Sequence, residues 1–360
     1  MKRRVLIWDT SISNMLEGKI FGGIAVQLYF WSQVFVENQW EVYSITNNEK
    51  NYIKQNIHFM RLKPNRYFSI IIDFIVAFFY VLKIKPDLIM MRGATNRLYN
   101  LSILSYIFGI KLVFMGASDV NFEPGKEQIN NNFNRKLYQC GLKKVKYVIT
   151  QNQYQTQKVI ENYNKKPLQL NSIWGEINIP YISDKTIKKY DIVWIANIRK
   201  LKRLEWILES ARKLPQYSFA IAGKFSESLQ YEKKLTNEMS NIQNLEYLGN
   251  IGIAESNKLV KEARLLVCTS EFEGFPNTFL QAWSMSIPVI STVNPNDIIL
   301  RQNLGFVVKT IEELVISIEE LLSNKDYYVT CQNSILKYFN NNHNALRSYY
   351  SLINYLKLST

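Results

Sequence analysis

SEFEGFPNTFLQ, residues 270–281, is the stretch that decides how this 360-residue chain folds. It follows an apolar run at 265–269, which is typical of a buried strand, and it leads into a predicted helix at 277–286. Gly274 and Pro276 shape the turn between them. Strand, turn and helix in this order form the unit of a parallel sheet, whose ligands bind at the carboxyl ends of the strands.

The start of that predicted helix is suited to an anion. The first backbone N–H groups of a helix, here those near Asn277 and Thr278, lack partners within the helix and attract a diphosphate. Phosphate would repel the neighbouring carboxylate of Glu273, which is better used to accept hydrogen bonds from sugar hydroxyls. Gln281 lies about two turns along and can reach a second polar group, such as a ribose. A loop with capping glutamates is the alternative interpretation.

The rest of the chain alternates between strand and helix patterns in two blocks. The expected strands are 5–8, 40–46, 56–62, 86–91, 111–115 and 146–150, then 191–196, 219–222, 245–248, 265–269 and 288–291. A segment with little periodicity, 171–189, separates the blocks. We therefore predict an α/β protein with two doubly wound parallel sheets. The expected domains are 1–172 and 188–335. The stretch 327–356 is strongly helical, and its end, about 340–357, is expected to pack back on the first domain.

From Glu273 onward the sequence resembles a known family. The segment 273–276, Gln281 and AWSMSIPVI at 282–290 are similar to the signature of the retaining group 1 glycosyltransferases, glycosyltransferase family 4. That signature is Glu, seven residues, Glu, then Ala-x-x-x-Gly-x-Pro-Val-Ile. Gln281 replaces the second Glu, which binds the ribose hydroxyls in the family, and Ser286 replaces the Gly. A Gln side chain still donates and accepts hydrogen bonds, without the charge.

The resemblance implies the GT-B fold, in which two Rossmann-like domains face each other across a cleft. It also implies a sugar transfer from a nucleotide-diphosphate sugar that retains the anomeric configuration, with no metal and no other cofactor. Front-face displacement is the working hypothesis: the donor phosphate oxygen takes the acceptor proton as the bond to the leaving group lengthens. The family's common setting is bacterial surface polysaccharide synthesis, in which capsule, O-antigen or exopolysaccharide units grow on a polyprenyl-diphosphate-linked or other glycan acceptor.

A basic turn after the strand at 191–196 is the second match to the family. The segment NIRKLKR, 197–203, is similar to the family's Gly-Arg-x-x-x-x-Lys loop, whose cations neutralise the donor diphosphate. Lys202 falls on the Lys position. Asn197 falls on the Arg position, and Arg199 could supply the missing charge. Cations that face a leaving diphosphate stabilise the charge that grows as the glycosidic bond breaks. A solvated basic turn is the alternative.

The first half carries weaker matches. GGIAVQ at 22–27 resembles the family's glycine-rich loop, where glycine permits close backbone approach, and KPDLI at 85–89 resembles a structural strand start. Ser118-Asp119 stands where many members have His-Asp. Ser118 could hydrogen-bond a sugar, and Asp119 is the acceptor-side candidate, against a helix-capping role. The predicted catalytic residues are Glu273 and Asp119, and the predicted donor-binding residues are Gly22, Gly23, Asn197, Arg199, Lys202, Gly223, Glu273, Gly274, Phe275, Pro276, Asn277 and Gln281.

Few residues are available for metal or thiol chemistry. The three cysteines are far apart and show no CxxC spacing, which argues against a zinc cluster or a disulfide framework and fits a reducing compartment. The two histidines, His58 and His343, leave little room for a triad or a His-rich metal site. The basic start of the chain is followed by an apolar run too short for a signal peptide. We therefore expect a cytoplasmic protein without a metal.

Positive charge is concentrated in the first half of the chain. The net charge is +14, and residues 1–180 contain 23 Lys and Arg against 12 Asp and Glu. Such a half could adhere to the inner membrane leaflet or bind a phosphate-bearing acceptor, and a generally basic surface is the alternative. No aromatic-plus-basic motif indicates nucleic acid. The apolar segment 68–82 is too short to span a bilayer, so it is either a buried helix or one that also enters the interface.

Two other functions stay open. A GT-B nucleotide-sugar 2-epimerase would favour an acidic, His-rich site, for which the sequence offers little. A catalytically decayed GT-B scaffold would account for Gln281 and for the missing His before Asp119. Nucleotide binding separates these possibilities, since an active transferase binds a nucleotide diphosphate and a decayed scaffold does not.

Overall fold

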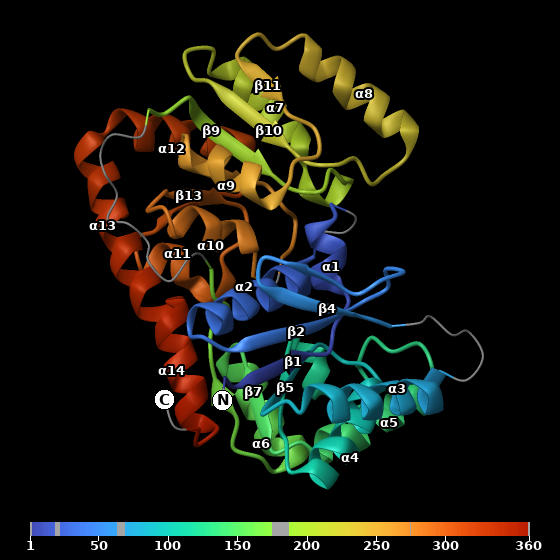
Figure 1. The fold of residues 1–360 in the computed structure, drawn as a ribbon. Coiled ribbons are helices and arrows are strands. Elements are labelled where there is room, and N and C mark those ends of the chain that lie inside the picture. The colour runs from blue at the N-terminus through green and yellow to red at the C-terminus, as the bar shows by residue number, and fades with distance from the viewer. Residues whose placement is uncertain (1, 19–21, 63–68, 175–186, 274, 359–360) are drawn as a thin grey trace. The chain divides into compact units, whose positions relative to one another are not determined.

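The chain forms two compact units in the computed structural model, which describes residues 2–18, 22–62, 69–174, 187–273 and 275–358. Unit 1 is Met1–Ile177 with Asn344–Thr360, and unit 2 is Asn178–His343. Figure 1 shows both units, which are described separately below. The sequence placed the corresponding domains at 1–172, with a returning helix at about 340–357, and at 188–335.

Unit 1 is built on an eight-stranded sheet with the order β3-β4-β2-β1-β5-β6-β7-β8. Neighbouring strands are parallel, apart from the antiparallel pair β3 and β4. The order reverses between β1 and β5, and in doubly wound sheets ligands bind at such a point. The strands are β1 (Arg4–Ile7), β2 (Glu41–Thr46), β3 (Tyr52–Lys54), β4 (Ile57–Arg61), β5 (Leu88–Arg92), β6 (Lys111–Met115), β7 (Tyr147–Thr150) and β8 (Leu168–Gln169).

Helices cover both faces of this sheet. The apolar side chains of α3, α4 and α5 share one core cluster with alternate residues of the strands, while α1 and α2 lie on the other side of the sheet (Figure 1). The last helix, α14, packs on α2, where the Trp40 indole N–H donates to the Tyr349 hydroxyl at 2.9 Å. The helices are α1 (Ser11–Leu16), α2 (Gly23–Glu37), α3 (Ser69–Ile84), α4 (Arg97–Phe108), α5 (Asn132–Lys144), α6 (Gln153–Tyr163) and α14 (Ala345–Tyr355), with a 3₁₀ turn, η1, at Asp119–Phe122.

Unit 2 has a six-stranded parallel sheet with the order β11-β10-β9-β12-β13-β14. Its strands are β9 (Tyr190–Ile195), β10 (Phe219–Ala222), β11 (Leu245–Tyr247), β12 (Ala263–Cys268), β13 (Val289–Ser291) and β14 (Gly305–Val307). Its helices are α7 (Leu204–Lys213), α8 (Leu229–Ser240), α9 (Ile253–Lys261), α10 (Asn277–Trp283), α11 (Ile298–Arg301), α12 (Ile311–Ser323) and α13 (Lys325–Asn342), with 3₁₀ turns η2 (Lys200–Lys202) and η3 (Pro295–Asp297). The predicted α/β class with two parallel sheets is confirmed.

Two predicted helices have different ends in the structure. The stretch 327–356 was expected to be helical throughout, but it is interrupted at His343 and Asn344, where the Asn344 carboxamide oxygen accepts the Arg347 N–H at 2.9 Å and starts α14. The helix predicted at 277–286 stops at Trp283. Ser286 has a φ of 51°, a left-handed conformation that a helix cannot continue through and that favours glycine.

The apolar segment at 68–82 corresponds to helix α3. Ala77, Val81 and Ile84 of this helix are buried, and its opposite side is exposed. Among the residues that the structure describes, no helix combines the length and the apolar character needed to cross a bilayer.

Ser286→Gly is expected to raise the free energy of unfolding of unit 2 by about 1 kcal/mol. The change removes the cost of a left-handed backbone at a residue with a side chain. It also removes a buried hydroxyl that has no hydrogen-bond partner among the described residues. Urea unfolding measures the difference.

Ser284→Gly is the matched control. Ser284 has a φ of −62° and its hydroxyl donates to the Gln281 carbonyl at 2.8 Å, so glycine should lower the stability by about 1 kcal/mol. Equal effects at the two positions would contradict the assignment of strain to Ser286.

Candidate functional site

Two loops meet at the carboxyl edge of the unit 2 sheet. Strands β9 and β12 are parallel neighbours, with Leu265 opposite Ile192. The loops that follow them, 196–203 and 269–276, therefore leave the sheet side by side, and the Glu271 N–H donates to the Leu201 carbonyl at 2.9 Å. Most of the predicted donor-binding residues belong to these two loops, whereas Gly22, Gly23, Gly223, Asn277 and Gln281 were predicted from other parts of the chain.

Lys202 and Glu273 form an ion pair across the two loops. The Lys202 ammonium binds Glu273 Oε1, and the Ser270 hydroxyl donates to the same oxygen at 3.3 Å. The side chains retain only 11% and 26% of their accessible surface, so the pair is largely withdrawn from water. A lysine ammonium has three donors, so Lys202 can bind Glu273 and an anion together. Glu273 Oε2 takes no part in these two bonds and can accept from another donor.

Arg203 holds the two loops together. Its Nε donates to the Thr269 carbonyl at 2.7 Å and its Nη2 to the Ser270 carbonyl at 3.2 Å, while the guanidinium lies 4.4 Å from the centre of the Trp206 ring. No role for Arg203 was predicted from the sequence. The available signal was Trp206 three residues later, at a spacing that allows the two side chains to stack.

Thr269 adds a second connection between the loops. Its hydroxyl accepts from the Trp194 indole at 3.0 Å and donates to the Lys202 carbonyl at 2.6 Å. On the other side, the Thr292 hydroxyl donates to the Ser270 carbonyl at 2.6 Å. The backbone on both sides of the Lys202–Glu273 pair is thus fixed by buried hydrogen bonds, which keeps the two charged side chains in place.

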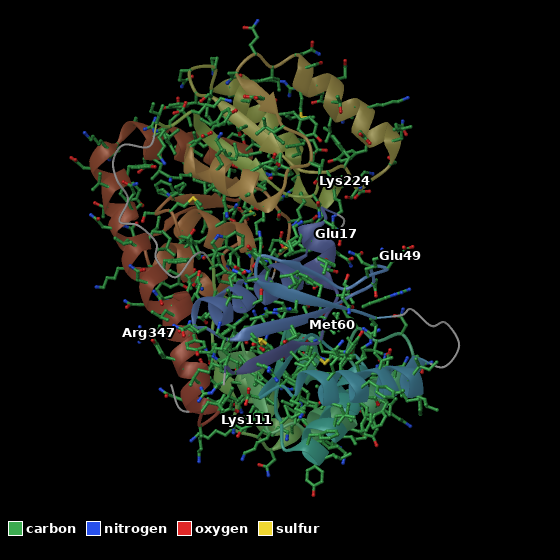
Figure 2. All side chains as sticks on the ribbon, in the orientation of Figure 1. Glu17, Glu49, Met60, Lys111, Lys224 and Arg347 are labelled. Carbon is green, nitrogen blue, oxygen red and sulfur yellow. The ribbon has the colours of Figure 1, made fainter. Side chains whose placement is uncertain are left out.

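The other predicted residues of the basic loop are exposed. Asn197 and Arg199 lie on either side of Ile198, whose N–H donates to the Lys224 carbonyl at 2.8 Å. Lys224, labelled in Figure 2, is also exposed and adds a cation to the same edge of the sheet. Gly223 precedes it, and a Cβ at Gly223 would lie 1.7 Å from the Ala196 carbonyl oxygen. Gly223 therefore has a structural role, because the absence of a side chain lets the loop after β10 approach Ala196 in the loop after β9.

The residues of the signature turn have separate roles. Phe275 packs its ring against Trp283 and His343, with centroid distances of 6.1 and 5.7 Å, and so belongs to the support of the turn. Pro276 is buried, and Asn277 begins α10. Because α10 has only seven residues, its end carries a weaker dipole than the predicted longer helix, and the nearby cations matter more. Gly274 lies outside the described residues.

Gln281 is buried, with 2% of its surface exposed. Its carboxamide nitrogen donates to the Ser256 hydroxyl at 2.8 Å and to Asn257 Oδ1 at 2.9 Å, both on α9. The carboxamide nitrogen of Gln281, predicted to contact the ribose, therefore uses both of its N–H donors within unit 2. The carboxamide oxygen takes part in neither bond and is the atom that can accept from a ligand hydroxyl.

Thiol chemistry has no support at this edge of the sheet. Burial raises the pKa of the Cys268 thiol, which keeps it protonated and unreactive near neutral pH. Within the described part of the chain, no group of three or more His, Cys, Asp and Glu side chains is arranged to hold a metal ion. The absence of a metal requirement stays a prediction.

In unit 1, the predicted residues lie at the carboxyl edge of the other sheet. Gly22 and Gly23 are exposed at the start of α2, and a Cβ at Gly22 would meet no atom within 4 Å. Ser118 and Asp119 are exposed after β6. Asp119 Oδ1 accepts from the Asn152 carboxamide at 3.0 Å and from the Gln155 carboxamide at 2.9 Å, so two amides orient this carboxylate.

Comparison with known proteins assigns unit 2 to a family. Residues 189–324 match the model of the family described as Glycosyl transferases group 1. This match covers both loops of the Lys202–Glu273 site and supports sugar transfer as the activity. No curated protein sequence matches the chain.

Solved structures share the fold of this chain at low sequence identity. A glycosyltransferase from Rickettsia africae has a TM-score of 0.71 and 15% identity, over 99% of this chain and 100% of that one. Sucrose-phosphate synthase from Thermosynechococcus elongatus has a TM-score of 0.70 and 13% identity, over 99% of both chains. HepE from Anabaena, solved with UDP and glucose, has a TM-score of 0.67 and 14% identity, over 99% of both chains. These likenesses show the GT-B fold.

Arg203→Lys is expected to lower the free energy of unfolding of unit 2 by about 2 kcal/mol, because lysine cannot reproduce two directed hydrogen bonds and the stacking on Trp206. Arg212→Lys is the control, since Arg212 is a surface residue paired with Glu209 and Glu238 and should change stability by about 0.5 kcal/mol or less. Chemical denaturation measures both variants. Equal losses would show that Arg203 does not hold the loops.

Proposed function

We propose that the chain is a retaining, metal-independent glycosyltransferase that moves a sugar from a nucleotide-diphosphate sugar to a polyprenyl-diphosphate-linked or other glycan acceptor. The Lys202–Glu273 pair carries this proposal, since it joins a cation for the diphosphate to a carboxylate for the sugar within the family-matched segment. Synthesis of a bacterial surface polysaccharide, such as capsule or O-antigen, is the proposed setting.

Lys202 and Arg199 supply the positive charge in the proposed donor site. The ammonium of Lys202 keeps two donors beyond the one that Glu273 uses, and Arg199 is exposed nearby in the same loop. Negative charge accumulates on the diphosphate as the glycosidic bond breaks, and fixed cations lower the energy of that state more than the energy of the bound donor. The hydrogen bonds of Thr269 and Arg203 hold this loop before the donor arrives.

Glu273 is proposed to orient the transferred sugar. Its Oε1 is occupied by Lys202 and Ser270, which leaves Oε2 to accept a sugar hydroxyl. The carboxamide oxygen of Gln281 is proposed to accept from the ribose. The nucleotide donor is supported by HepE, which was solved with UDP and glucose.

Asp119 is proposed to contact the acceptor. The two carboxamides of Asn152 and Gln155 both bind its Oδ1, which leaves Oδ2 to accept from an acceptor hydroxyl. Ser118, exposed beside it, can donate or accept a further bond. In this reading Asp119 positions the hydroxyl, and the donor phosphate oxygen takes its proton.

Glu273→Ala is expected to reduce kcat/KM for sugar transfer by at least about a hundredfold, because the sugar loses a charged hydrogen-bond acceptor and Lys202 loses its partner. Transfer of radiolabelled sugar to an acceptor extract measures the effect. Glu271→Ala is the control: this exposed glutamate lies two residues away and should keep activity within about twofold. Near-normal turnover by Glu273→Ala would contradict the site.

Nucleotide binding separates the transferase from the two alternatives. The wild-type chain should bind a nucleoside diphosphate and gain thermal stability in proportion to the logarithm of ligand concentration. A decayed scaffold would show no such gain. An epimerase would convert the donor sugar in the absence of an acceptor, which product analysis detects.

An apolar surface of unit 1 supports contact with the inner membrane leaflet. On α3, the exposed residues Ile71, Ile75, Phe79 and Leu82 follow helical spacing, and the end of α4 adds Tyr106, Ile107 and Phe108. The two helices are adjacent here, with the Phe78 and Phe108 rings 5.8 Å apart. Lys83 and Lys85 are exposed at the end of α3, so cations lie beside the apolar surface, as on proteins that bind anionic lipid.

The Ile71→Ser/Phe79→Ser double variant is expected to bind vesicles of phosphatidylglycerol and phosphatidylethanolamine at least about tenfold more weakly than the wild type, because two large side chains no longer enter the interface. Flotation at low salt measures binding. Ile316→Ser is the control, since Ile316 is 62% exposed and lies on unit 2. If the wild type does not float, the membrane contact is refuted.

A further inference from the structure

Arg92 is a buried cation of unit 1 that has no partner among the residues that the structure describes. It is the last residue of β5 and only 5% of its surface is exposed. Its Nε is buried and makes no hydrogen bond within the described part of the chain. Burial lowers the pKa of Arg92 to about 10, so the guanidinium stays charged at neutral pH. A buried charge without a counter-charge is costly, and a fold keeps one where a ligand supplies the missing charge.

The position of Arg92 in the sheet is where a ligand is expected. β5 pairs with β1 on one side and with β6 on the other, and the strand order reverses between β1 and β5. Ile89 and Met91 belong to the core cluster shared with α3, α4 and α5. Because side chains alternate along a strand, Arg92 points to the opposite face, where α2 lies.

The amino-terminal turn of α2 meets the end of β5. A Cβ at Gly93, the residue after Arg92, would lie 3.1 Å from Cδ1 of Ile24, which is in the first turn of α2. The 15-residue helix begins after Gly22, makes no side-chain cap bond and has no acidic residue in its first turn. Among the described residues, a Cβ at Gly22 would meet no atom within 4 Å. The first N–H groups of a helix lack partners within the helix and favour negative charge nearby.

No carboxylate of the described residues neutralises Arg92. Desolvation is the one cause of its lowered pKa, with no contribution from a neighbouring acid. Asp9, which follows β1, is engaged instead by the N–H and the hydroxyl of Ser11. Thr95, three residues after Arg92, has a buried hydroxyl that also lacks a partner among the described residues. Arg92 and Thr95 thus leave donors unused within one short segment.

We propose that Arg92 binds a phosphate group, with the buried Thr95 hydroxyl as a further donor, and that this group belongs to the acceptor. The guanidinium offers a planar set of donors that matches two oxygens of a phosphate, and the amino-terminal end of α2 adds positive potential, while its Gly22 and Gly23 stay the predicted donor contacts. The acceptor assignment rests on the proposed function, whereas the phosphate site does not. Arg92 would select acceptors that carry a phosphate near the hydroxyl that receives the sugar.

Isothermal titration of the full chain with inorganic phosphate at constant ionic strength tests the site. Arg92→Met should weaken phosphate binding at least tenfold. Without phosphate it should raise the melting temperature by about 2–4 °C, because an uncompensated buried charge is removed. Arg92→Lys, which keeps the charge but loses the planar donor set, should bind with intermediate affinity. Arg97→Met is the control, since Arg97 is paired with Asp73 near the surface, and it should bind phosphate as the wild type does.

Unchanged phosphate affinity in Arg92→Met would overturn the site. If the melting temperature of that variant is also lowered, Arg92 is a structural residue. Lys202→Met separates this site from the donor site, since it should retain phosphate binding at Arg92. If Lys202→Met abolishes phosphate binding and Arg92→Met does not, the inference fails and the proposed function stands. If Glu273→Ala transfers sugar normally while Arg92→Met loses phosphate, the proposed function fails and the phosphate site stands.

Farnesyl phosphate tests the acceptor assignment. It should compete with inorganic phosphate in the wild type and should lose that competition in Arg92→Met. Binding of farnesyl phosphate without competition would contradict the assignment of the site to the acceptor.

Discussion

The pairing of β9 with β12 is the constraint on which the unit 2 site depends. Neighbouring strands of a sheet are about 4.8 Å apart, so the loops that follow two paired parallel strands must share one edge. Here that geometry brings Lys202 and Glu273, which are 71 residues apart in sequence, into contact. Thr269 and Arg203 then fix the loops by hydrogen bonds, so the positions of the two charges follow from the sheet register.

The two units differ in whether a buried cation has a carboxylate beside it. In unit 2 a partly buried cation has a carboxylate beside it, and hydrogen bonds to both loops maintain that arrangement. In unit 1 no carboxylate of the described residues forms an ion pair with the buried Arg92. A paired charge keeps its geometry without a ligand, whereas an unpaired one stays costly until an anion arrives. Lys202 is therefore suited to hold a site in position, and Arg92 is suited to discriminate between ligands.

The regular elements were largely predictable from the sequence. The apolar runs at 111–115 and 219–222 gave the observed limits of β6 and β10, because these strands are largely buried. Lys202 and Glu273 were found from short motifs. Helix α12, although amphipathic, was not predicted, and the helix end at Trp283 was missed because Ser gives no sign of a left-handed backbone.

The remaining features depend on contacts distant in sequence. Arg203 is one basic residue among several in its loop, and its role comes from carbonyl groups 66 and 67 residues away. Arg92 follows an apolar run and is read as the end of a strand. Only the packed structure shows that its Nε is buried and that none of the described residues accepts a hydrogen bond from it. Periodicity in the sequence predicts helices and strands, but it does not predict which buried polar groups lack hydrogen-bond partners.

The interruption at His343 and Asn344 has a consequence for synthesis on the ribosome. Unit 1 includes α14, whose Tyr349 accepts the Trp40 indole N–H, so its packing is incomplete until residues 345–355 have been translated. Unit 2 ends before that point, and all of its strands and helices are made earlier. Until then the α2 surface that α14 covers has no helix on it, although the strands of both sheets have already been translated. Exposed apolar surface of this kind makes a partly synthesised chain prone to aggregation.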